Sequence, residues 1–565
     1  MKRTRFLLVQ LLAVAAALAC GQPARSAVIY VAPSGNDGNP GTSWAAAKAT
    51  PGGAIAAASA GDEVWVAAGT YADTHVAIPA GVTIYGGFAG DEPTRENRNP
   101  ALHETILDGG GTGAVVTLAA SAAAGQGVDG FTIRNGHVGV LATDSAGLIS
   151  GNIIRDNVGG LFGTLQGAGI YVSGGNPVIR NNTIAHNHSG HDGGGVYAQV
   201  SRVTVADNVV EGNTSDRNGG GISFYECTEV VVTGNTVRGN ECANNAAGGV
   251  SVFNSGVSGT AVVEGNTLEG CRAFGPYGAG GLLVWGVAAE VRGNRIAGNT
   301  ARSGGGIYLA YGTVVLEENV IEENSATETG AGGLTSIEVA SLVLSRNTLR
   351  GNQGVDWGGA VVAGKDALIE DNLIESNEGG AWGGGMHISG VALTMQRNRF
   401  VRNTAHQNGG GAEVSGCPSF LIANNLFDGN RGVYNCALTV AFTDNAADWP
   451  SRNRVINNTF VNNQTIVATG GTTLGLYQGV AVIANNILAS NPAGGIYSNP
   501  GGISLPNSAV LNNNLFDSIW GFAGAVDDGG GNLVVDPLFA NAAASDYHLQ
   551  DTSQCLDAGA TAAAS

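Results

Sequence analysis

The stretch RNNTIAHNHSGHDGGGVYAQ, residues 180–199, contains the two elements that recur along most of this 565-residue chain. The first is NTIAHN at 182–187, an instance of N-x-φ-x-x-N in which φ is apolar, and the second is GGGVYA at 193–198. The hexapeptide recurs in fourteen copies, from NIIRDN at 152 to a worn NLFDSI at 514, at steps of 25 to 33 residues. Chance does not produce fourteen copies in register, so the pattern indicates a repeat protein.

Two columns of apolar residues flank the first asparagine of each copy. One lies three residues before it, from Ile149 to Leu511, and the other lies two residues after it, from Ile154 to Phe516. Each column predicts a short strand that sends one side chain inward. The asparagine between them predicts a tight bend, because Asn tolerates left-handed φ and can hydrogen-bond the backbone.

A third strand is expected after the glycines, in segments such as GGGVYA, GGGISF, AGGVSV and GGGIYL. Three short strands per coil of about 28 residues predict an all-β fold, the right-handed parallel β-helix. Coils then stack about 4.8 Å apart, with aliphatic stacks inside and asparagine ladders at the corner. Leucine-rich and helical repeats are excluded because the chain lacks their spacing.

The ends of the chain differ from the repeats and predict four segments. Residues 1–27 have a basic start and an apolar run of 14 residues, which is typical of a signal peptide. Residues 28–110 are expected to form an N-terminal cap and irregular first coils, with a short helix that starts at Pro51 and ends at Gly61-Asp62, before the first strand at EVWV. The repeats fill 111–530, and 531–565 form a closing segment that a truncation could have shortened.

The signal peptide predicts export, to the extracellular space or to the outer membrane or surface of a bacterium. Two modes of processing stay open, namely ordinary cleavage near Ala27 and a lipid anchor at Cys20 in the sequence ALAC. No later stretch is apolar enough for a transmembrane helix. The six remaining cysteines could form disulfides or could be small buried thiols.

Charge restricts the partners of this protein. The formal charge is −19, and only three lysines occur. An acidic surface repels phosphate backbones and anionic lipid, so nucleic acid and membrane surfaces are poor partners. A polyanionic sugar would also be repelled unless Ca²⁺ or an arginine cluster intervened.

The histidines of the opening stretch look like a metal-ligand cluster, with His186, His188, His191 and Asp192 close in sequence. The repeat register instead assigns HSGHD, residues 188–192, to a loop whose counterparts vary freely from coil to coil. Among the four, His191 and Asp192 could reach one another. We therefore expect a variable surface here and no metal site.

Both ends resemble known sequences. The segments IYVAPSGNDGNPGTSWAAAKAT (29–50) and GDEVWVAAGTY (61–71) resemble the start of secreted bacterial β-helix repeat proteins of the pectate-lyase-like superfamily. The segment DPLFANAAASDYHLQDTSQCLDAGA (536–560) resembles the end of the choice-of-anchor Q group, and the GG[AG][IV] elements resemble polymorphic outer-membrane proteins. The resemblance implies secretion, a β-helix fold and often a C-terminal anchoring region.

The resemblance also implies where a ligand would bind, because β-helix polysaccharide enzymes carry substrate along the strand that follows the glycines. Outward positions of that strand carry Tyr171, Tyr197 and Tyr308, and the flanking loops carry Trp357 and Trp382. These five residues are the predicted ligand-binding residues, because aromatic rings can stack on sugars.

The candidate catalytic residues are His387 and Glu413, which the register places one coil apart, about 5 Å from each other. Asp356, Glu378 and His406 lie in adjoining loops as supporting residues. A carboxylate beside a histidine can perform acid–base chemistry, and we expect it to raise the pKa of the histidine. Lyases of this superfamily usually have Lys or Arg near a Ca²⁺-binding acidic cluster, and this sequence has no residue-by-residue match to that pattern. No cofactor is firmly predicted, and Ca²⁺ stays a possible one.

Three functions follow from this sequence. The leading hypothesis is an exported protein with an elongated face that binds polysaccharide or another cell-surface ligand without catalysis. The second is a polysaccharide lyase or glycoside hydrolase that acts in the groove along the glycine-led strand. The third is a passive surface spacer or adhesin.

Overall fold

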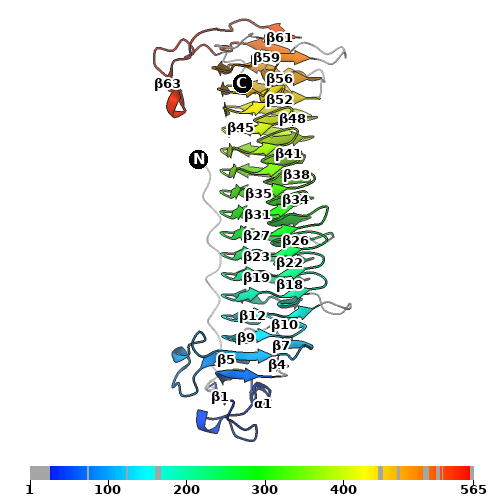
Figure 1. Ribbon diagram of the computed structural model, residues 1–565, viewed down its shortest axis with the longest axis vertical. Coiled ribbons are helices and arrows are strands. Elements are labelled where there is room, and N and C mark those ends of the chain that lie inside the picture. The colour runs from blue at the N-terminus through cyan, green and yellow to red at the C-terminus, as the bar shows by residue number, and fades with distance from the viewer. Residues whose placement is uncertain are drawn as a thin grey trace, which may run out of the picture.

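The protein is an elongated solenoid of stacked coils, with an N-terminal cap at one end and a C-terminal hairpin beside the other (Figure 1). The structure is a computed structural model that describes residues 26–559 except 73–74, 123–124, 160–166, 257, 443–448, 467–470, 500–507, 517–521 and 525. Cys20 and nearly all of the expected signal peptide lie outside the described residues. No helix in the described part is long and apolar enough to cross a membrane.

One coil illustrates how the repeat folds. It contains β14 (Ile170–Ser173), β15 (Val178–Arg180), β16 (Thr183–Ala185) and β17 (His188–Ser189). Each strand pairs in parallel with its counterpart in the next coil, namely β18 (Val196–Gln199), β19 (Arg202–Ala206), β20 (Val209–Glu211) and β21 (Thr214–Ser215). The all-β parallel solenoid is confirmed, but each such coil has a fourth strand of two residues where we predicted only a loop.

The strands assemble into long sheets that run the length of the solenoid. Glycine-led strands and the strands before the asparagine form one 34-stranded sheet, and the other two strand types form sheets of 16 and 12 strands. The glycine-led strands that carry the candidate site are β22 (Ile222–Tyr225), β26 (Val250–Phe253), β30 (Leu282–Trp285), β34 (Ile307–Ala310), β38 (Leu334–Ser345), β41 (Ala360–Glu370), β44 (Met386–Ser389), β48 (Ala412–Ser415), β52 (Asn435–Ala441) and β56 (Thr472–Tyr477).

The two predicted apolar columns form the core. Their members from Ile149 to Ile483 and from Ile154 to Leu488 are fully buried. Near the C-terminal end one column becomes a stack of phenylalanine rings, with centroids 4.8 Å apart between Phe400 and Phe427 and 4.9 Å apart between Phe427 and Phe460. Stacking of like residues on successive coils therefore fills the interior without large voids.

The prediction for the last repeat is wrong by one residue. Asn513, not Asn514, continues the ladder, since its Oδ1 accepts a hydrogen bond of 2.9 Å from the backbone N–H of Asn486. Consequently Val510 and Leu515 point inward, and the predicted Leu511 and Phe516 are only half-buried. The run of three asparagines at 512–514 leaves the register open, and a slip of one residue turns every side chain to the other face.

Buried asparagines link the coils along two corners. The side-chain amide of Asn182 donates to the carbonyl of Ile149 at 2.9 Å and to Oδ1 of Asn208 at 3.0 Å, and this pattern repeats from coil to coil. Asn187 belongs to a second, parallel ladder. The left-handed φ that we expected of the asparagine belongs instead to the residue before it, such as Asn181 at 54°. The asparagine supplies the hydrogen bonds, and its neighbour makes the bend.

One position interrupts the second ladder. Cys271 lies where the pattern would place an asparagine, between Asn240 and Asn299. Its Sγ lies 3.9 Å from Nδ2 of Asn240 and 3.6 Å from the carbonyl of Val237, so both contacts are weaker than an amide would make. The described cysteines are all free thiols, and five of the six are buried.

The N-terminal cap closes the first coils. Helix α1 (Pro51–Ile55) starts at the predicted proline, and Oγ1 of Thr50 accepts a hydrogen bond of 3.0 Å from the N–H of Gly53. It ends earlier than the predicted Gly61. The first strand is β1 (Val28–Val31), which pairs with β2 (Glu63–Ala67), so EVWV forms the second strand and not the first.

The closing segment folds back against the side of the solenoid. Strands β63 (Phe539–Asn541) and β64 (Asp546–Leu549) form an antiparallel hairpin, seen beside the upper coils in Figure 1. The hydroxyl of Tyr547 donates to Oδ2 of Asp428 at 2.8 Å and accepts from Asn462 at 3.1 Å. A short helix, α2 (Trp449–Arg452), precedes β53 (Asn453–Ile456) near this end.

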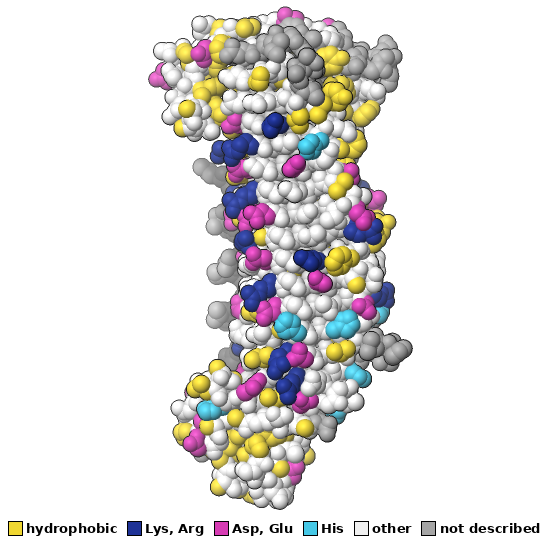
Figure 2. All heavy atoms as spheres, in the orientation of Figure 1, with side chains coloured by type: hydrophobic (Ala, Val, Ile, Leu, Met, Phe, Trp, Pro, Cys, Tyr) yellow, Lys and Arg dark blue, Asp and Glu magenta, His cyan; other side chains and the backbone are white. Residues whose placement is uncertain are grey.

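Charged side chains on the surface pair with one another between neighbouring coils. Examples are Arg397 with Asp371 at 2.9 Å and Arg295 with Glu322 at 2.9 Å. Figure 2 shows basic and acidic side chains side by side along one edge of the solenoid. Each exposed pair contributes little to stability, but this pairing leaves few basic groups free for anionic ligands.

Candidate functional site

The outer face of the glycine-led strands contains a hollow at β44 and β48. The parallel register sets His387 beside Glu413, and Nδ1 of the histidine lies 3.9 Å from Oε2 of the carboxyl, too far for a hydrogen bond. The hollow has a volume of about 570 Å³. Its lining consists of Trp357, Trp382, His387, Asn408, Glu413, Thr439, Ala441, Phe442, Tyr477 and Gln478.

Burial governs the ionisation of the central pair. The side chains of His387 and Glu413 are 14% and 10% exposed. Burial lowers the pKa of His387 from 6.5 to about 4 and raises the pKa of Glu413 from 4.5 to about 7. Both groups are therefore uncharged in mildly acidic solution. The expectation that the carboxyl raises the pKa of the histidine is wrong, because loss of water around the imidazole outweighs the neighbouring acid.

Three buried polar atoms in the hollow have no hydrogen-bond partner among the described residues. They are Nε1 of Trp357, Nδ1 of His387 and Oε2 of Glu413. Trp357 stacks on His387 with ring centroids 5.2 Å apart, so the indole and the imidazole hold each other in place. Buried polar groups are nearly always paired in native proteins, and three unpaired ones on adjoining residues indicate a place for a hydrogen-bonding ligand.

Trp382 presents a free aromatic surface at the edge of the hollow. Its side chain is 37% exposed and stacks on no other aromatic ring of the described residues. The supporting residues Asp356, Glu378 and His406 do not belong to the lining. Glu378 and His406 instead pair with each other, Oε1 to Nε2 at 2.9 Å, on the exposed surface. The structure thus brings together four of the predicted residues, namely Trp357, Trp382, His387 and Glu413.

The predicted tyrosines do not form an open binding strip. Tyr197 and Tyr308 are only 2% and 3% exposed, and Tyr171 stacks on Tyr197 with centroids 5.6 Å apart. Alanines of the preceding loops, including Ala247 and Ala279, pack beside Tyr308. In this parallel solenoid Tyr171 and Tyr197 lie on successive coils and cover each other, and Leu283 and Thr335 lie on either side of Tyr308, so these ring faces are hidden from a ligand.

The histidine cluster of the opening stretch divides among separate partners. Nδ1 of His188 lies 2.8 Å from the hydroxyl of Thr214, and Nδ1 of His191 lies 3.2 Å from Oδ2 of Asp192, the contact that we expected. His186 is exposed with a left-handed φ of 55°. No group of three or more potential metal ligands occurs among the described residues.

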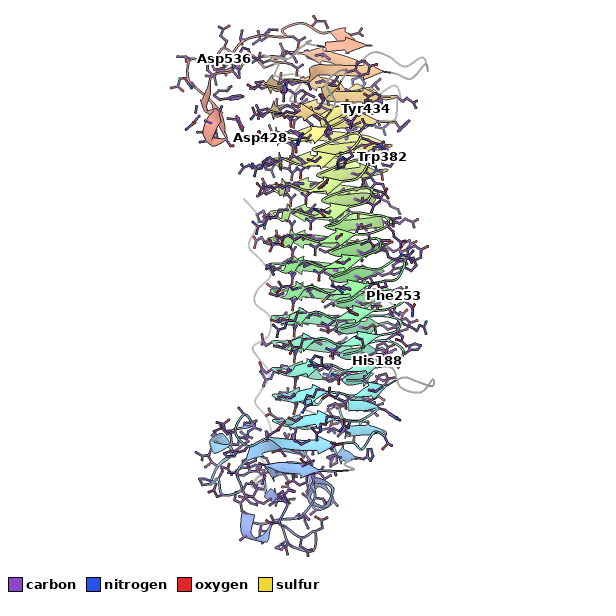
Figure 3. All side chains as sticks on the ribbon, in the orientation of Figure 1. His188, Phe253, Trp382, Asp428, Tyr434 and Asp536 are labelled. Carbon is purple, nitrogen blue, oxygen red and sulfur yellow. The ribbon has the colours of Figure 1, made fainter. Side chains whose placement is uncertain are left out.

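Sequence reasoning missed a partly exposed column of aromatic side chains, which we name the aromatic ladder: Tyr225, Phe253, Trp285 and Tyr311. Centroids are 5.8, 5.5 and 5.0 Å apart along the column. The first three occupy the second outward position of β22, β26 and β30, in register. Our prediction considered only the first outward position, so alignment of the strands by one more outward residue would have found them. Figure 3 labels Phe253 and Trp382, both on the right-hand side of the view.

These observations define a parallel β-solenoid with a recessed, partly aromatic site on one sheet. The chain belongs to the right-handed β-helix family, whose sequence model, described as "Right handed beta helix region", matches residues 113–286 and 280–460. No curated protein matches the sequence.

Several solved structures share the fold at low similarity. The siphovirus 9NA tailspike receptor-binding domain is 11% identical over 86% of this chain and 76% of its own, with a TM-score of 0.24. The GH136 lacto-N-biosidase from Eubacterium ramulus is 12% identical over 90% and 67%, with a TM-score of 0.20. The PL6 family alginate lyase AlyGC is 11% identical over 90% and 100%, with a TM-score of 0.19.

Proposed function

We propose that this protein binds a neutral carbohydrate in the hollow around His387 and Glu413, without catalysis. The observation that carries the proposal is the set of three unpartnered polar atoms, on Trp357, His387 and Glu413, beside the free ring of Trp382. A sugar offers hydroxyls that both donate and accept, and an apolar ring face that can lie on an indole. One ligand could therefore satisfy all four groups.

The charge of the hollow supports a neutral ligand. Its described lining contains no lysine or arginine, and its one carboxyl, Glu413, carries a full charge only above its raised pKa of about 7. An anionic sugar would meet no counter-charge there and would approach a chain of net charge −19. A neutral glycan needs no counter-charge and is not repelled by the negative chain.

A polysaccharide panel tests this proposal. Purified protein is run on gels that contain neutral or uronate-bearing polysaccharides, and retention is compared for the wild type, Trp382→Ala and a control, Tyr277→Ala. Tyr277 is exposed but does not line the hollow. We expect retention by a neutral polymer, weakened by Trp382→Ala and unchanged by Tyr277→Ala. Equal retention of Trp382→Ala and wild type would overturn the assignment of the hollow.

The pKa shifts give one reason to keep an enzyme as the second candidate. A carboxyl with a pKa of about 7 can donate a proton near neutrality, whereas an imidazole with a pKa of about 4 is only a weak proton acceptor there. Hydrolysis by two carboxylates lacks its second group here, since Asp356 and Glu378 do not line the hollow. The same panel, assayed for 235 nm absorbance and for reducing ends, distinguishes an enzyme from a binding protein. Turnover by the wild type that Glu413→Gln abolishes would show that the hollow is catalytic.

An exported, cell-surface location belongs to the same proposal and depends on the signal-like sequence of residues 1–27. Mass spectrometry of the mature N-terminus tests it. A terminus near Ala27 would show ordinary cleavage, and a lipid-modified Cys20 would show an anchor. An intact Met1 in protein recovered from cells would contradict export.

A further inference from the structure

A second concavity lies at the corner where the glycine-led strands turn into the next strand. We name it the corner groove. It has a volume of about 980 Å³ and runs across six successive coils, from Ser258 and Gly259 to Ser389 and Gly390. Its lining is mostly glycine, alanine and serine, and the larger side chains include Tyr311, Ile337, Glu338 and Lys365.

The shape of the corner groove suits a linear ligand that lies along the solenoid axis. Five steps between six coils, at about 4.8 Å each, give a length of roughly 24 Å. The volume lies at the upper end of the range of about 300–1,000 Å³ for ligand sites. A compact small molecule would fill only part of such a trough.

The backbone of the corner groove has no free strand edge for a peptide. The N–H of Gly286 donates to Ala310 at 2.9 Å, and the carbonyl of Gly312 accepts from Ala340 at 2.7 Å. The N–H of Gly390 donates to Ser415 at 3.1 Å. Because the coils use these groups among themselves, a peptide could not add as a further strand.

Tyr311 supplies an aromatic face at the corner groove. The rings of Tyr225 and Phe253 are 4° from parallel, and those of Phe253 and Trp285 are 26° from parallel, so these faces cover one another. The ring of Tyr311 is tilted by 57° from Trp285 and is 46% exposed. The aromatic ladder thus ends in a ring whose outer face is open to the groove that it lines.

The charges of the corner groove cancel. Lys365 and Glu338 are the only Lys, Arg, Asp or Glu side chains in its described lining. The phenol of Tyr311 is uncharged at neutral pH, and the Glu338 carboxylate raises its pKa further. An anionic or cationic polymer would find one favourable and one unfavourable contact. A neutral polymer with many hydroxyls would find a donor in Lys365, an acceptor in Glu338 and the ring of Tyr311.

We propose that the corner groove is a second carbohydrate site, which holds a linear neutral polysaccharide along the axis of the solenoid with Tyr311 as its stacking platform. It shares only the class of ligand with the proposed function, because the hollow and the corner groove lie at opposite ends of the same strands, on the outward face. Strand β44 carries both sites: His387 lines the hollow, and Ser389 lines the corner groove.

The test compares polymer retention of wild type, Tyr311→Ala, Ala340→Trp, Trp382→Ala and the control Tyr277→Ala. Ala340 is exposed in the groove lining, so a tryptophan there blocks the trough without touching the core. Residue 311 has a left-handed φ of 51°, and Tyr311→Ala replaces one L residue by another, so the substitution adds no new backbone constraint there. Melting curves check that each variant is folded. We expect Tyr311→Ala and Ala340→Trp each to weaken retention by roughly two- to tenfold, the range of one aromatic contact.

The outcomes separate the two sites. Retention that falls in Tyr311→Ala and Ala340→Trp but not in Trp382→Ala supports the corner groove and refutes the hollow. Retention that falls in Trp382→Ala but not in Tyr311→Ala or Ala340→Trp refutes the corner groove alone. Capture of an extended peptide, with no neutral polysaccharide retained, refutes both proposals. If folded wild type is retained by no polysaccharide of the panel, both proposals fail. A short oligosaccharide that binds with the affinity of the polymer would also overturn the linear-chain proposal.

Discussion

Replacement of Glu413 by glutamine should change how stability depends on pH, in a direction set by burial. Between pH 4.5 and about 7 the folded carboxyl keeps a proton that the unfolded chain has released. Stability therefore falls as pH rises through this window, because ionisation in the hollow is costly. The shift of about 2.5 pH units corresponds to roughly 3 kcal/mol at about 1.36 kcal/mol per unit.

His387 has the opposite effect over nearly the same window. Between pH about 4 and 6.5 the unfolded histidine binds a proton that the folded one does not. Stability from this group is lost as pH falls, again by roughly 3 kcal/mol over the window. In the wild type the two contributions cancel from about pH 4.5 to 6.5, so each should emerge only when the other is removed.

Urea unfolding of wild type, Glu413→Gln and His387→Gln at pH 4, 5.5 and 7.5 measures these differences. Relative to wild type, Glu413→Gln should gain roughly 3 kcal/mol between pH 4 and 7.5, and His387→Gln should lose a similar amount. Glu378→Gln is the control, because that carboxyl is half-exposed and outside the hollow. If Glu413→Gln instead loses stability as pH rises, an ion pair of His387 and Glu413 exists and the burial reasoning is refuted.

Four further variants test the architecture by thermal or urea unfolding or by hydrogen exchange. Val291→Asp should cost several kcal/mol, because it buries a charge in the core, whereas Arg302→Ala on the surface should change stability by less than about 0.5 kcal/mol; equal losses would show a wrong register. Cys271→Asn should add about 1 kcal/mol by completing the second ladder, and a lower melting temperature would contradict that reading. Tyr547→Phe removes the hydrogen bond to Asp428 and should increase the rate of amide hydrogen exchange in the C-terminal hairpin. Unchanged protection of residues 539–549 would show that this contact does not hold the hairpin in place.

The repeat made most of the fold predictable, because a parallel solenoid sets like residues on top of one another. A column such as that of Ile149 and Ile179 has one environment in every coil, so its period gives the inward positions directly. The position of the bend was harder to predict from the sequence. In most coils the left-handed residue before the first asparagine is Gly, Asn or Asp, which favour positive φ, but our prediction assigned the bend to the asparagine one position later. The fourth strand has only two residues per coil, and its buried position carries small residues such as Ser189, Ala301 and Gly379, which do not stand out as an apolar column.

The candidate site was predictable only in part. The neighbouring positions of His387 and Glu413 follow from the register alone. Their pKa shifts do not, because they depend on how far the loops around Trp357 and Trp382 exclude water. Loops of the preceding coils, with Ala247 and Ala279, pack beside Tyr308 and bury it, although the repeat pattern predicted it on the outside. Loop paths are not periodic, so a repeat alignment cannot show which outward side chains stay open.

The asparagine ladders also affect how the molecule comes apart. An interior asparagine such as Asn324 donates to Asn352 on one side and accepts from Asn299 on the other, so removal of one coil from the middle would leave buried amides unpaired on two sides. Fraying from the two ends breaks each rung on one side only. The central coils should therefore exchange amide hydrogens and yield to proteases last, and the durability of the middle would depend on how well the terminal coils are clamped.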